Sequence, residues 1–336
     1  MADTVYTPFA SDDIVPANPS RITNALWSNG VGILETFYTS SEVEDPPILN
    51  DRYYIDIYAG DPTTEQVEFS VAYGHVSGSG APSTDLDYPT KAIYTQYKNL
   101  LLNNPTGQFT YVSAGTTVSM SQFYAISIKR ANIKQRLDVG NWELHLSWPA
   151  SSSALSLIDE SGDSLDTSAG NVLRSYAVIS GSISGGQVGT KSYGLVYPDY
   201  GVILLNAETL GTDLTMSINS GSTSYVGISG RSNLHQFFMA LTGSEYFAAR
   251  SEEQISSTHY FVRVKNQQYN YSTNPTFYSA SDGTIIQSGF YNDPQVFLTT
   301  VGLYNDSNEL LAVAKLSQPV TKAFDKEALV KVRLDF

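Results

Sequence analysis

The stretch TTVGLYNDSNELLAVAKLSQPV, residues 299–320, contains the clearest structural signal in the sequence. Two apolar segments flank four turn-forming residues, Asn305-Asp306-Ser307-Asn308. Asn, Asp and Ser tolerate the backbone dihedral angles of a tight turn, and their side chains bond back to the main chain. We therefore predict an antiparallel hairpin of residues 295–304 and 309–316, after which Pro319 ends the second strand.

The segment EALVKVRLDF, residues 327–336, alternates between apolar and mixed positions. This two-residue period predicts a β-strand with one buried face. The predicted buried face comprises Ala328, Val330, Val332, Leu334 and Phe336. We expect this strand to return against the hairpin, so that the three strands form one unit with Lys331 and Arg333 facing solvent or an acidic neighbour.

The same period recurs earlier in the chain. DRYYIDIYAG and EQVEFSVAYG alternate apolar and polar residues, and Gly60-Asp61-Pro62-Thr63 lies between them, so residues 52–74 are predicted to form a hairpin. Further segments with a strand pattern are FYAISIKR, NWELHLSW, GLVYPDYGVILLN and YFVRVKN.

Two segments have helical spacing instead. In DYPTKAIYTQYKNLLLNNP, Asp87 can cap a helix, Pro89 suits its first turn, and Asn103-Asn104-Pro105 ends it. In SNLHQFFMALTG the apolar residues share one face, and Gly243 is a natural stop. The sequence therefore predicts a mainly β protein, built from β-sandwich-like modules with one or two short helices.

Length and loop composition indicate several domains. The 336 residues exceed a typical single domain. We expect an extended acidic arm over residues 1–50, a β-rich domain over 51–150 with a helix near 89–102, a polar loop region over 151–192, and a β-rich domain over 193–336. The Ser/Gly/Asp-rich segments 75–87 and 151–192 are predicted to be mobile in the isolated protein and ordered in an assembly.

Charge and cysteine content exclude several classes of function. The net charge is −14, and residues 1–90 contain 14 acidic side chains against two basic ones. This region repels phosphate backbones, so nucleic acid is not an expected partner. Two interpretations of the acidic region remain open, a solvated surface and a patch that docks a basic neighbour.

There is no cysteine, which excludes disulfides and thiolate chemistry. We expect no membrane span, because no run of about 18 apolar residues occurs, and no signal peptide.

Motifs for catalysis or metal binding were not found. His75, His145, His235 and His259 are far apart in the sequence and form no metal-binding pair. Asp159, Asp163 and Asp166 miss the spacing of a calcium loop. In GGQVGTKS, residues 185–192, a threonine replaces the glycine that precedes the lysine of a phosphate loop. We predict no catalytic, cofactor-binding or metal-binding residues; a β-rich hydrolase with a carboxylate pair remains an alternative.

Several segments together resemble virion structural proteins of large contractile-tailed bacteriophages (cyanophage-like myoviruses). These segments are RYYIDIY, VEFSVAYGHVSGSG, KAIYTQYKNLLL, LDVGNWELHL, YGLVYPDYGVILLN, YFVRVKNQQYNYSTNPTF, VGLYNDSNELLAVAKLSQPV and KEALVKVRLDF. The resemblance covers most of the chain from about residue 50 and includes no catalytic motif.

The resemblance implies a non-enzymatic component of the tail, baseplate or neck, located in the virion and made in the host cytoplasm. Its expected partners are other virion proteins in a multi-copy assembly, in which it is an oligomer, without nucleic acid, membrane or cofactor. The alternative is a carbohydrate-binding or receptor-binding tail fibre protein, whose exposed tyrosines would stack on sugars.

Overall fold

The computed structural model describes residues 6–28, 30–39, 54–80, 89–102, 104, 106–149, 153–160, 173–218, 233–272 and 274–335. They form two compact units. Unit 2 extends from Arg21 to Glu253, whereas unit 1 combines the residues up to Ser20 with those from Gln254 onward. Unit 2 is thus inserted into the chain of unit 1.

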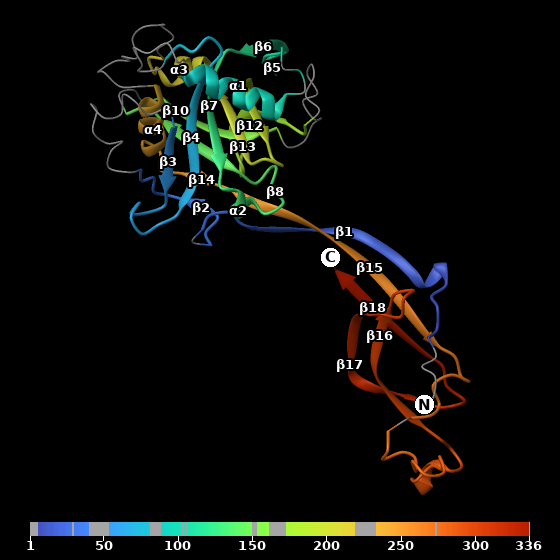
Figure 1. Ribbon diagram of the computed structural model, residues 1–336. Coiled ribbons are helices and arrows are strands. Elements are labelled where there is room, and N and C mark those ends of the chain that lie inside the picture. Colours follow the sequence, from blue (N-terminus) through green and yellow to red (C-terminus); the bar gives the residue numbers. More distant parts are fainter. Residues whose placement is uncertain are drawn as a thin grey trace. The chain divides into compact units, whose positions relative to one another are not determined.

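A ten-stranded antiparallel sheet is the framework of unit 2 (Figure 1). In spatial order its strands are β2 (Ile33–Leu34), β14 (Phe247–Ala248), β9 (Glu143–Ser147), β10 (Ala154–Asp159), β11 (Tyr176–Ser182), β12 (Gly186–Tyr197), β13 (Val202–Asn206), β7 (Gln122–Ile128), β4 (Val67–His75) and β3 (Tyr54–Tyr58). The segment after β2 bridges to β3, because Tyr38 and Tyr58 exchange backbone hydrogen bonds of 2.9 and 2.8 Å. This bridge joins the two ends of the strand order.

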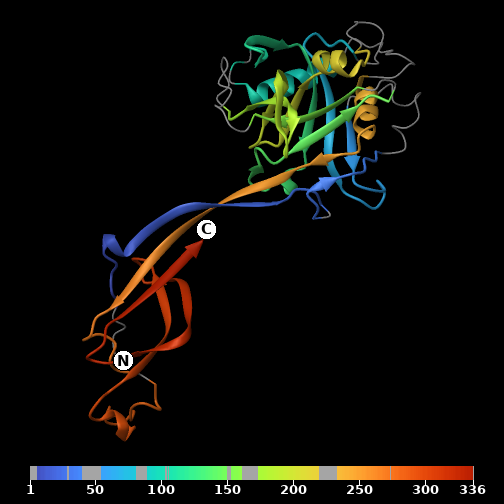
Figure 2. The same ribbon diagram turned by 180° about the vertical axis from the view of Figure 1, so that it is seen from behind.

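Both faces of this sheet are covered, as the alternation along β7 shows. Tyr124 and Ile126 belong to a core that includes α3 (Ala207–Leu214) and α4 (Asn233–Thr242). Phe123 and Ala125 point the other way, into a core with α1 (Pro89–Leu101) and the hairpin of β5 (Phe109–Ser113) and β6 (Thr116–Met120). Figure 2 shows the same layers from behind. Residues of β7 are therefore buried on both sides.

Unit 1 has a smaller core between a hairpin and a second sheet. The hairpin consists of β16 (Val296–Tyr304) and β17 (Leu310–Lys322), and the sheet has the order β1 (Ile14–Ala25), β15 (Arg250–Val264), β18 (Ala328–Asp335). Leu303 of the hairpin packs with Val330 and Val332 of β18. Strand β15 also pairs with the short β8 (Arg136–Leu137), which follows α2 (Arg130–Ile133) in unit 2. The described residues also include two 3₁₀ turns, Ser11–Asp13 and Ser288–Phe290.

The predicted fold class is confirmed, since strands make up 48% of the structure and helices 15%. Both predicted helices exist as α1 and α4, but α2 and α3 were not predicted.

Helix α3 follows β13 without a loop, and the Asn206 side chain caps it by accepting hydrogen bonds from the backbone N–H groups of Glu208 and Thr209. Because an apolar strand runs directly into this helix, the pattern of the sequence shows no break between them.

The predicted hairpin of residues 295–304 and 309–316 is also confirmed. In its turn the Asn305 side chain accepts hydrogen bonds from the backbone N–H groups of Ser307 and Glu309, at 3.0 and 2.8 Å. Pro319, however, does not end the second strand, because β17 continues to Lys322. The pairing of the two strands is interrupted, because Leu298 lies opposite Val320 but Thr300 already lies opposite Lys315. Pro319 lies in this interruption, where the strand does not need a backbone N–H group to donate to its partner.

The strand predicted at 327–336 exists as β18, with Val330 and Val332 buried. Its expected pairing was wrong, because β18 pairs with β15 and not with the hairpin. The packing of its apolar face against the hairpin does occur. Phe336 lies outside the described residues.

The domain boundaries differ from the expected ones. Strands from 51–150 and from 193–253 share one sheet, and the expected arm over 1–50 contributes β1 and β2. The expected polar loop region 151–192 contains β10, β11 and the first half of β12, because Leu155 and Leu157 alternate with small residues. Of the segments predicted to be mobile, residues 81–87, 151–152 and 161–172 lie outside the described residues.

The close approach of β12 and β13 can be tested by a substitution at Gly194. A Cβ atom here would lie 1.9 Å from the carbonyl oxygen of Leu204 on β13. We expect Gly194→Ala to lower the free energy of unfolding of unit 2 by about 3 kcal/mol, since backbone would have to move. Urea unfolding followed by tryptophan fluorescence measures this unit, because Trp27, Trp142 and Trp148 all lie in it.

The matched control is Gly32→Ala. A Cβ atom at Gly32 would meet nothing closer than an Arg250 side-chain nitrogen at 3.6 Å, an ordinary contact. Its free energy of unfolding should change by no more than about 0.5 kcal/mol. Equal unfolding midpoints for the two variants would contradict the close approach of β12 and β13.

Candidate functional site: buried carboxylates and an exposed hairpin face

The four histidines belong to four different elements, β4, β9, α4 and β15. His75, His145 and His235 belong to unit 2 and His259 belongs to unit 1. Burial lowers the pKa of His75, which keeps its ring neutral, and its Nδ1 accepts backbone N–H hydrogen bonds from Ser77 and Ser79. In the described part of the chain, no three His, Asp or Glu side chains are grouped so that they could hold a metal ion.

His145 belongs to a polar pair on β9. Its Nε2 lies 2.5 Å from Oε1 of Glu143, and the Tyr246 ring stacks on the imidazole with 4.3 Å between centroids. The second oxygen of Glu143 accepts the backbone N–H of Ile183 at 2.8 Å. These contacts hold the β11–β12 turn and the start of β14 against β9. Glu143 and His145 therefore have a structural role.

The other motif candidates are also part of the framework. Asp159 ends β10 and accepts the backbone N–H of Gly140 with both oxygens, at 3.0 and 2.9 Å. Asp163 and Asp166 lie outside the described residues. The segment 185–192 is the turn and first half of β12, where Lys191 donates to both carboxylate oxygens of Asp213 at 2.6 and 2.7 Å.

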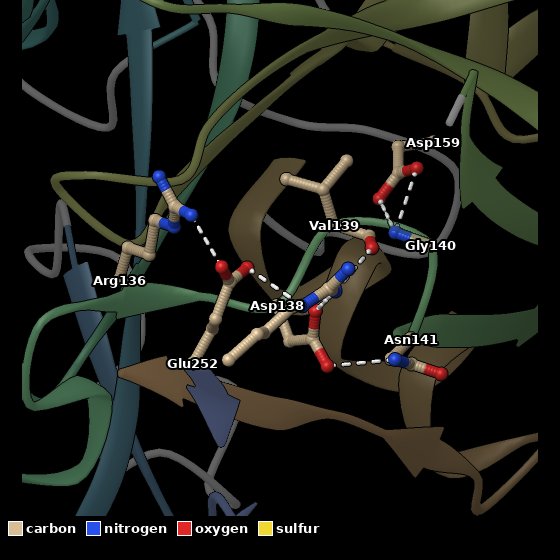
Figure 3. A network of polar contacts seen from close by, with 8 residues as sticks. Arg136, Asp138, Val139, Gly140, Asn141, Asp159 and Glu252 are labelled. Carbon is tan, nitrogen blue, oxygen red and sulfur yellow. Dashed lines mark hydrogen bonds and ion pairs between the residues drawn. The ribbon is translucent and has the colours of Figure 1, made fainter. Parts of the chain in front are cut away.

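An ionic network with buried carboxylates joins β8 to the parts of β1 and β15 that belong to unit 2 (Figure 3); the Arg21 side chain in it is 50% exposed. Glu252 on β15 is 3% exposed and pairs with two arginines: Arg136 of β8, and Arg21 of β1 at 3.3 Å. Arg21 also pairs with Asp138, which is fully buried. The second oxygen of Asp138 accepts from the Asn141 side chain at 2.6 Å.

The charges of this network match. The hydrogen bond to Glu252 raises the pKa of Arg136, so the guanidinium remains charged. Two buried carboxylates thus face two arginines, and this balance offsets the cost of removing the carboxylates from water. Arg21 and Glu252 lie next to the points where β1 and β15 pass into unit 1. Sequence reasoning missed the network because its three ion pairs join residues 117, 231 and 116 positions apart.

The surface feature that could have a function is one side of the hairpin in unit 1. Leu303, Val301, Ala312 and Ala314 point inward to the core. The residues between them point outward, and we call this side the outer hairpin face. It consists of Thr300, Gly302, Tyr304, Leu310, Leu311, Val313 and Lys315, all of which are exposed.

The outer hairpin face is apolar over most of its length. Leu311 is 68% exposed, Val313 58% and Leu310 52%. The Tyr304 ring lies over Gly302, since a Cβ atom at Gly302 would meet its Cε2 at 2.9 Å. Large aliphatic side chains that gather on a solvent-facing sheet are a mark of an interaction surface. The sequence did contain this signal, because apolar residues occupy both faces of β17.

A second surface feature is the connection between β15 and β16. Lys322 is fully buried and donates to the carbonyl oxygen of Asn266, the side-chain oxygen of Asn270 and the carbonyl oxygen of Ala323, at 2.7–2.9 Å. This fixes the start of the connection. Beyond it the ring of Tyr271, which is 50% exposed, packs against Phe277 at 5.8 Å between centroids. Tyr291 is 62% exposed.

The ionic network can be tested through Glu252. We expect Glu252→Gln to lower the free energy of unfolding of unit 2 by about 3 kcal/mol, because it leaves Arg136, whose side chain is 14% exposed, without its charge partner. Arg21 keeps its second partner, Asp138. Urea unfolding followed by tryptophan fluorescence measures the loss. The control is Glu253→Gln at the next residue, whose partner Lys134 is half exposed, and it should cost less than about 1 kcal/mol. Similar losses in both variants would show that the network is not a special source of stability.

No protein-family model, curated protein or solved structure was found to match this chain. Among the helices of the described residues, none has the length and apolar character needed to cross a membrane.

Proposed function

We propose that this protein is a non-enzymatic structural component of a bacteriophage virion, which assembles through protein–protein contacts in the tail, baseplate or neck. The observation that supports this most is the outer hairpin face, an apolar surface that a freely soluble monomer has no reason to expose. The resemblance of segments along most of the chain to virion structural proteins supplies the biological setting.

The charge distribution supports the same proposal. Unit 2, residues 21–253, contains 23 acidic and 12 basic side chains, a net charge of −11, whereas unit 1, residues 1–20 and 254–336, contains ten acidic and seven basic side chains, a net charge of −3. A strongly charged surface keeps protein molecules apart in solution. Unit 1 has the smaller net charge, so it resists close contacts less than unit 2 does, and it contains the outer hairpin face.

Mass spectrometry of purified particles tests the proposal. We expect the protein in particles that have been washed at high salt, in a constant molar ratio to other tail proteins. The control is the lysate fraction without particles, which should be depleted of the protein. Absence from washed particles, or a ratio that varies between preparations, would rule out a structural role in the virion.

The alternative, a carbohydrate-binding or receptor-binding tail fibre protein, is favoured by one observation. Tyr271 and Tyr291 expose half or more of their surface on the connection that Lys322 holds in place. Aromatic rings that are exposed and fixed can bind an apolar ligand face, while their hydroxyl groups form hydrogen bonds.

A glycan array with the wild-type protein tests this alternative. If it is correct, Tyr291→Ala should weaken the binding of any glycan bound by the wild type by about tenfold, on the order of 1.4 kcal/mol. Tyr200→Ala, which removes an exposed tyrosine from unit 2, is the control and should bind as the wild type does. An array without a bound glycan would leave no support for this alternative.

A further inference from the structure

We propose that His75 is a pH-sensitive switch, whose protonation releases the turn of residues 76–80 from the end of β4 and loosens the first turn of α1. This inference concerns the isolated chain and does not depend on the proposed virion function. It comes from the segment HVSGSG, residues 75–80, which that function does not use.

The turn holds the ring of His75 through its own backbone. His75 is the last residue of β4 and is 8% exposed. Its Nδ1 accepts the backbone N–H groups of Ser77 and Ser79, at 3.1 and 3.3 Å. The turn can curl in this way because Gly78 and Gly80 have φ angles of 89° and 75°, in the left-handed region that favours glycine. The alternation of serine and glycine therefore directs two N–H groups at one nitrogen.

These two donors fix the tautomer of the ring. A backbone N–H group donates and cannot accept, so Nδ1 of His75 has to offer its lone pair, and the one proton of the neutral ring lies on Nε2. A second proton would occupy Nδ1 and face both N–H groups. Of the three groups at Nδ1, only the Ser77 hydroxyl, whose oxygen lies 3.0 Å away, can reverse its role and accept. Protonation therefore removes both contacts to the backbone of the turn.

Ser79 connects the turn to α1. Its backbone N–H group donates to His75, and its carbonyl oxygen accepts the hydroxyl group of Thr90 at 2.9 Å. Thr90 is the second residue of α1 and is 1% exposed. Further along the helix, the Tyr94 ring stacks on Phe123 of β7 with 5.2 Å between centroids. A turn that leaves His75 therefore loosens the start of a helix that covers the core.

The neighbouring strand β7 presents neutral groups to His75. Gln122 lies opposite His75 in the register of the sheet. Its Oε1 accepts the hydroxyl group of Tyr73 at 2.6 Å. Burial raises the pKa of Tyr73 and of Tyr124, so both phenols keep their protons. No carboxylate on β4 or β7 near His75 can therefore stabilise an imidazolium, since these neighbours are an amide and two phenols.

The two helices that pack on β4 do not supply a counter-charge either. The charged residues of α1 are Lys91 and Lys98, and the titratable residue of α4 is His235. Burial lowers the pKa of His75, and no charged side chain of the described residues adds to that shift. Because this pKa lies below the value of about 6.5 for an unconstrained histidine, the turn is held at neutral pH and loses stability as the pH falls through about 6.5.

Hydrogen exchange of the full chain between about pH 7.5 and 5, a range that spans the ordinary pKa of histidine, tests the switch. Each rate is divided by the intrinsic exchange rate at that pH. The protection of the Ser77 and Ser79 amides should fall by up to about tenfold for each pH unit below about 6.5, the most that one proton taken up on opening allows. The amide of Val76 donates to the carbonyl oxygen of Ser121 at 2.8 Å and should change much less.

Two variants separate His75 from other effects of acid. In His75→Asn the side-chain oxygen can accept the same N–H groups but does not titrate, so the protection of Ser77 and Ser79 should no longer depend on pH. His259→Asn removes a histidine from unit 1 and should keep the wild-type pH dependence at both amides.

The tautomer of the wild-type ring gives a measurement that needs no variant. Nitrogen NMR of the chain with labelled histidine should show the proton of His75 on Nε2 at neutral pH. A proton on Nδ1 would overturn the proposal. Protection of Ser77 and Ser79 that is constant with pH in the wild type, or that changes equally in the wild type and in His75→Asn, would overturn it as well.

Discussion

Buried carboxylates impose the constraint on which much of unit 2 depends. Glu68 and Asp138 are fully buried, and Asp159 and Glu252 are 2% and 3% exposed. An ionised carboxylate in an apolar interior costs several kcal/mol unless donors surround it. The donors come from distant segments: Ser28 and Asn132 to Glu68, Gly140 to Asp159, and two arginines to Glu252. Each carboxylate therefore fixes the position of a segment that lies far away in the sequence.

The two units differ in how completely their sheets are covered. In unit 2 helices pack on one face of the sheet, and a helix with a hairpin packs on the other, so the central strands expose little. In unit 1 the inner side of the hairpin β16–β17 packs on the core, and on its outer side the Tyr304 ring packs against Tyr6 at 4.8 Å between centroids. Most of the exposed large apolar side chains of the described residues therefore lie in unit 1, although unit 2 is the larger unit and has most of the net charge.

Sequence patterns predicted the features that depend on neighbouring residues. The hairpin at 295–316 followed from alternation and from the turn residues Asn305 to Asn308, and α1 and α4 followed from spacing and end signals. Features that depend on distant residues were not predicted. The pairing of β18 with β15 depends on packing choices that alternation alone does not contain, because either neighbour would satisfy the pattern. The partners of Glu252 lie too far along the chain for any local spacing to indicate them.

The insertion of unit 2 within unit 1 has a consequence for synthesis. The segment up to Ser20 leaves the ribosome before unit 2 does, but the other residues of unit 1 begin only at Gln254. At about 5–20 residues per second, roughly 10–50 seconds pass before those strands exist. Unit 2 can fold during this interval, while the first segment waits without its neighbours. Pro16 and Pro19 in this segment hinder its pairing with strands of other nascent chains during that interval.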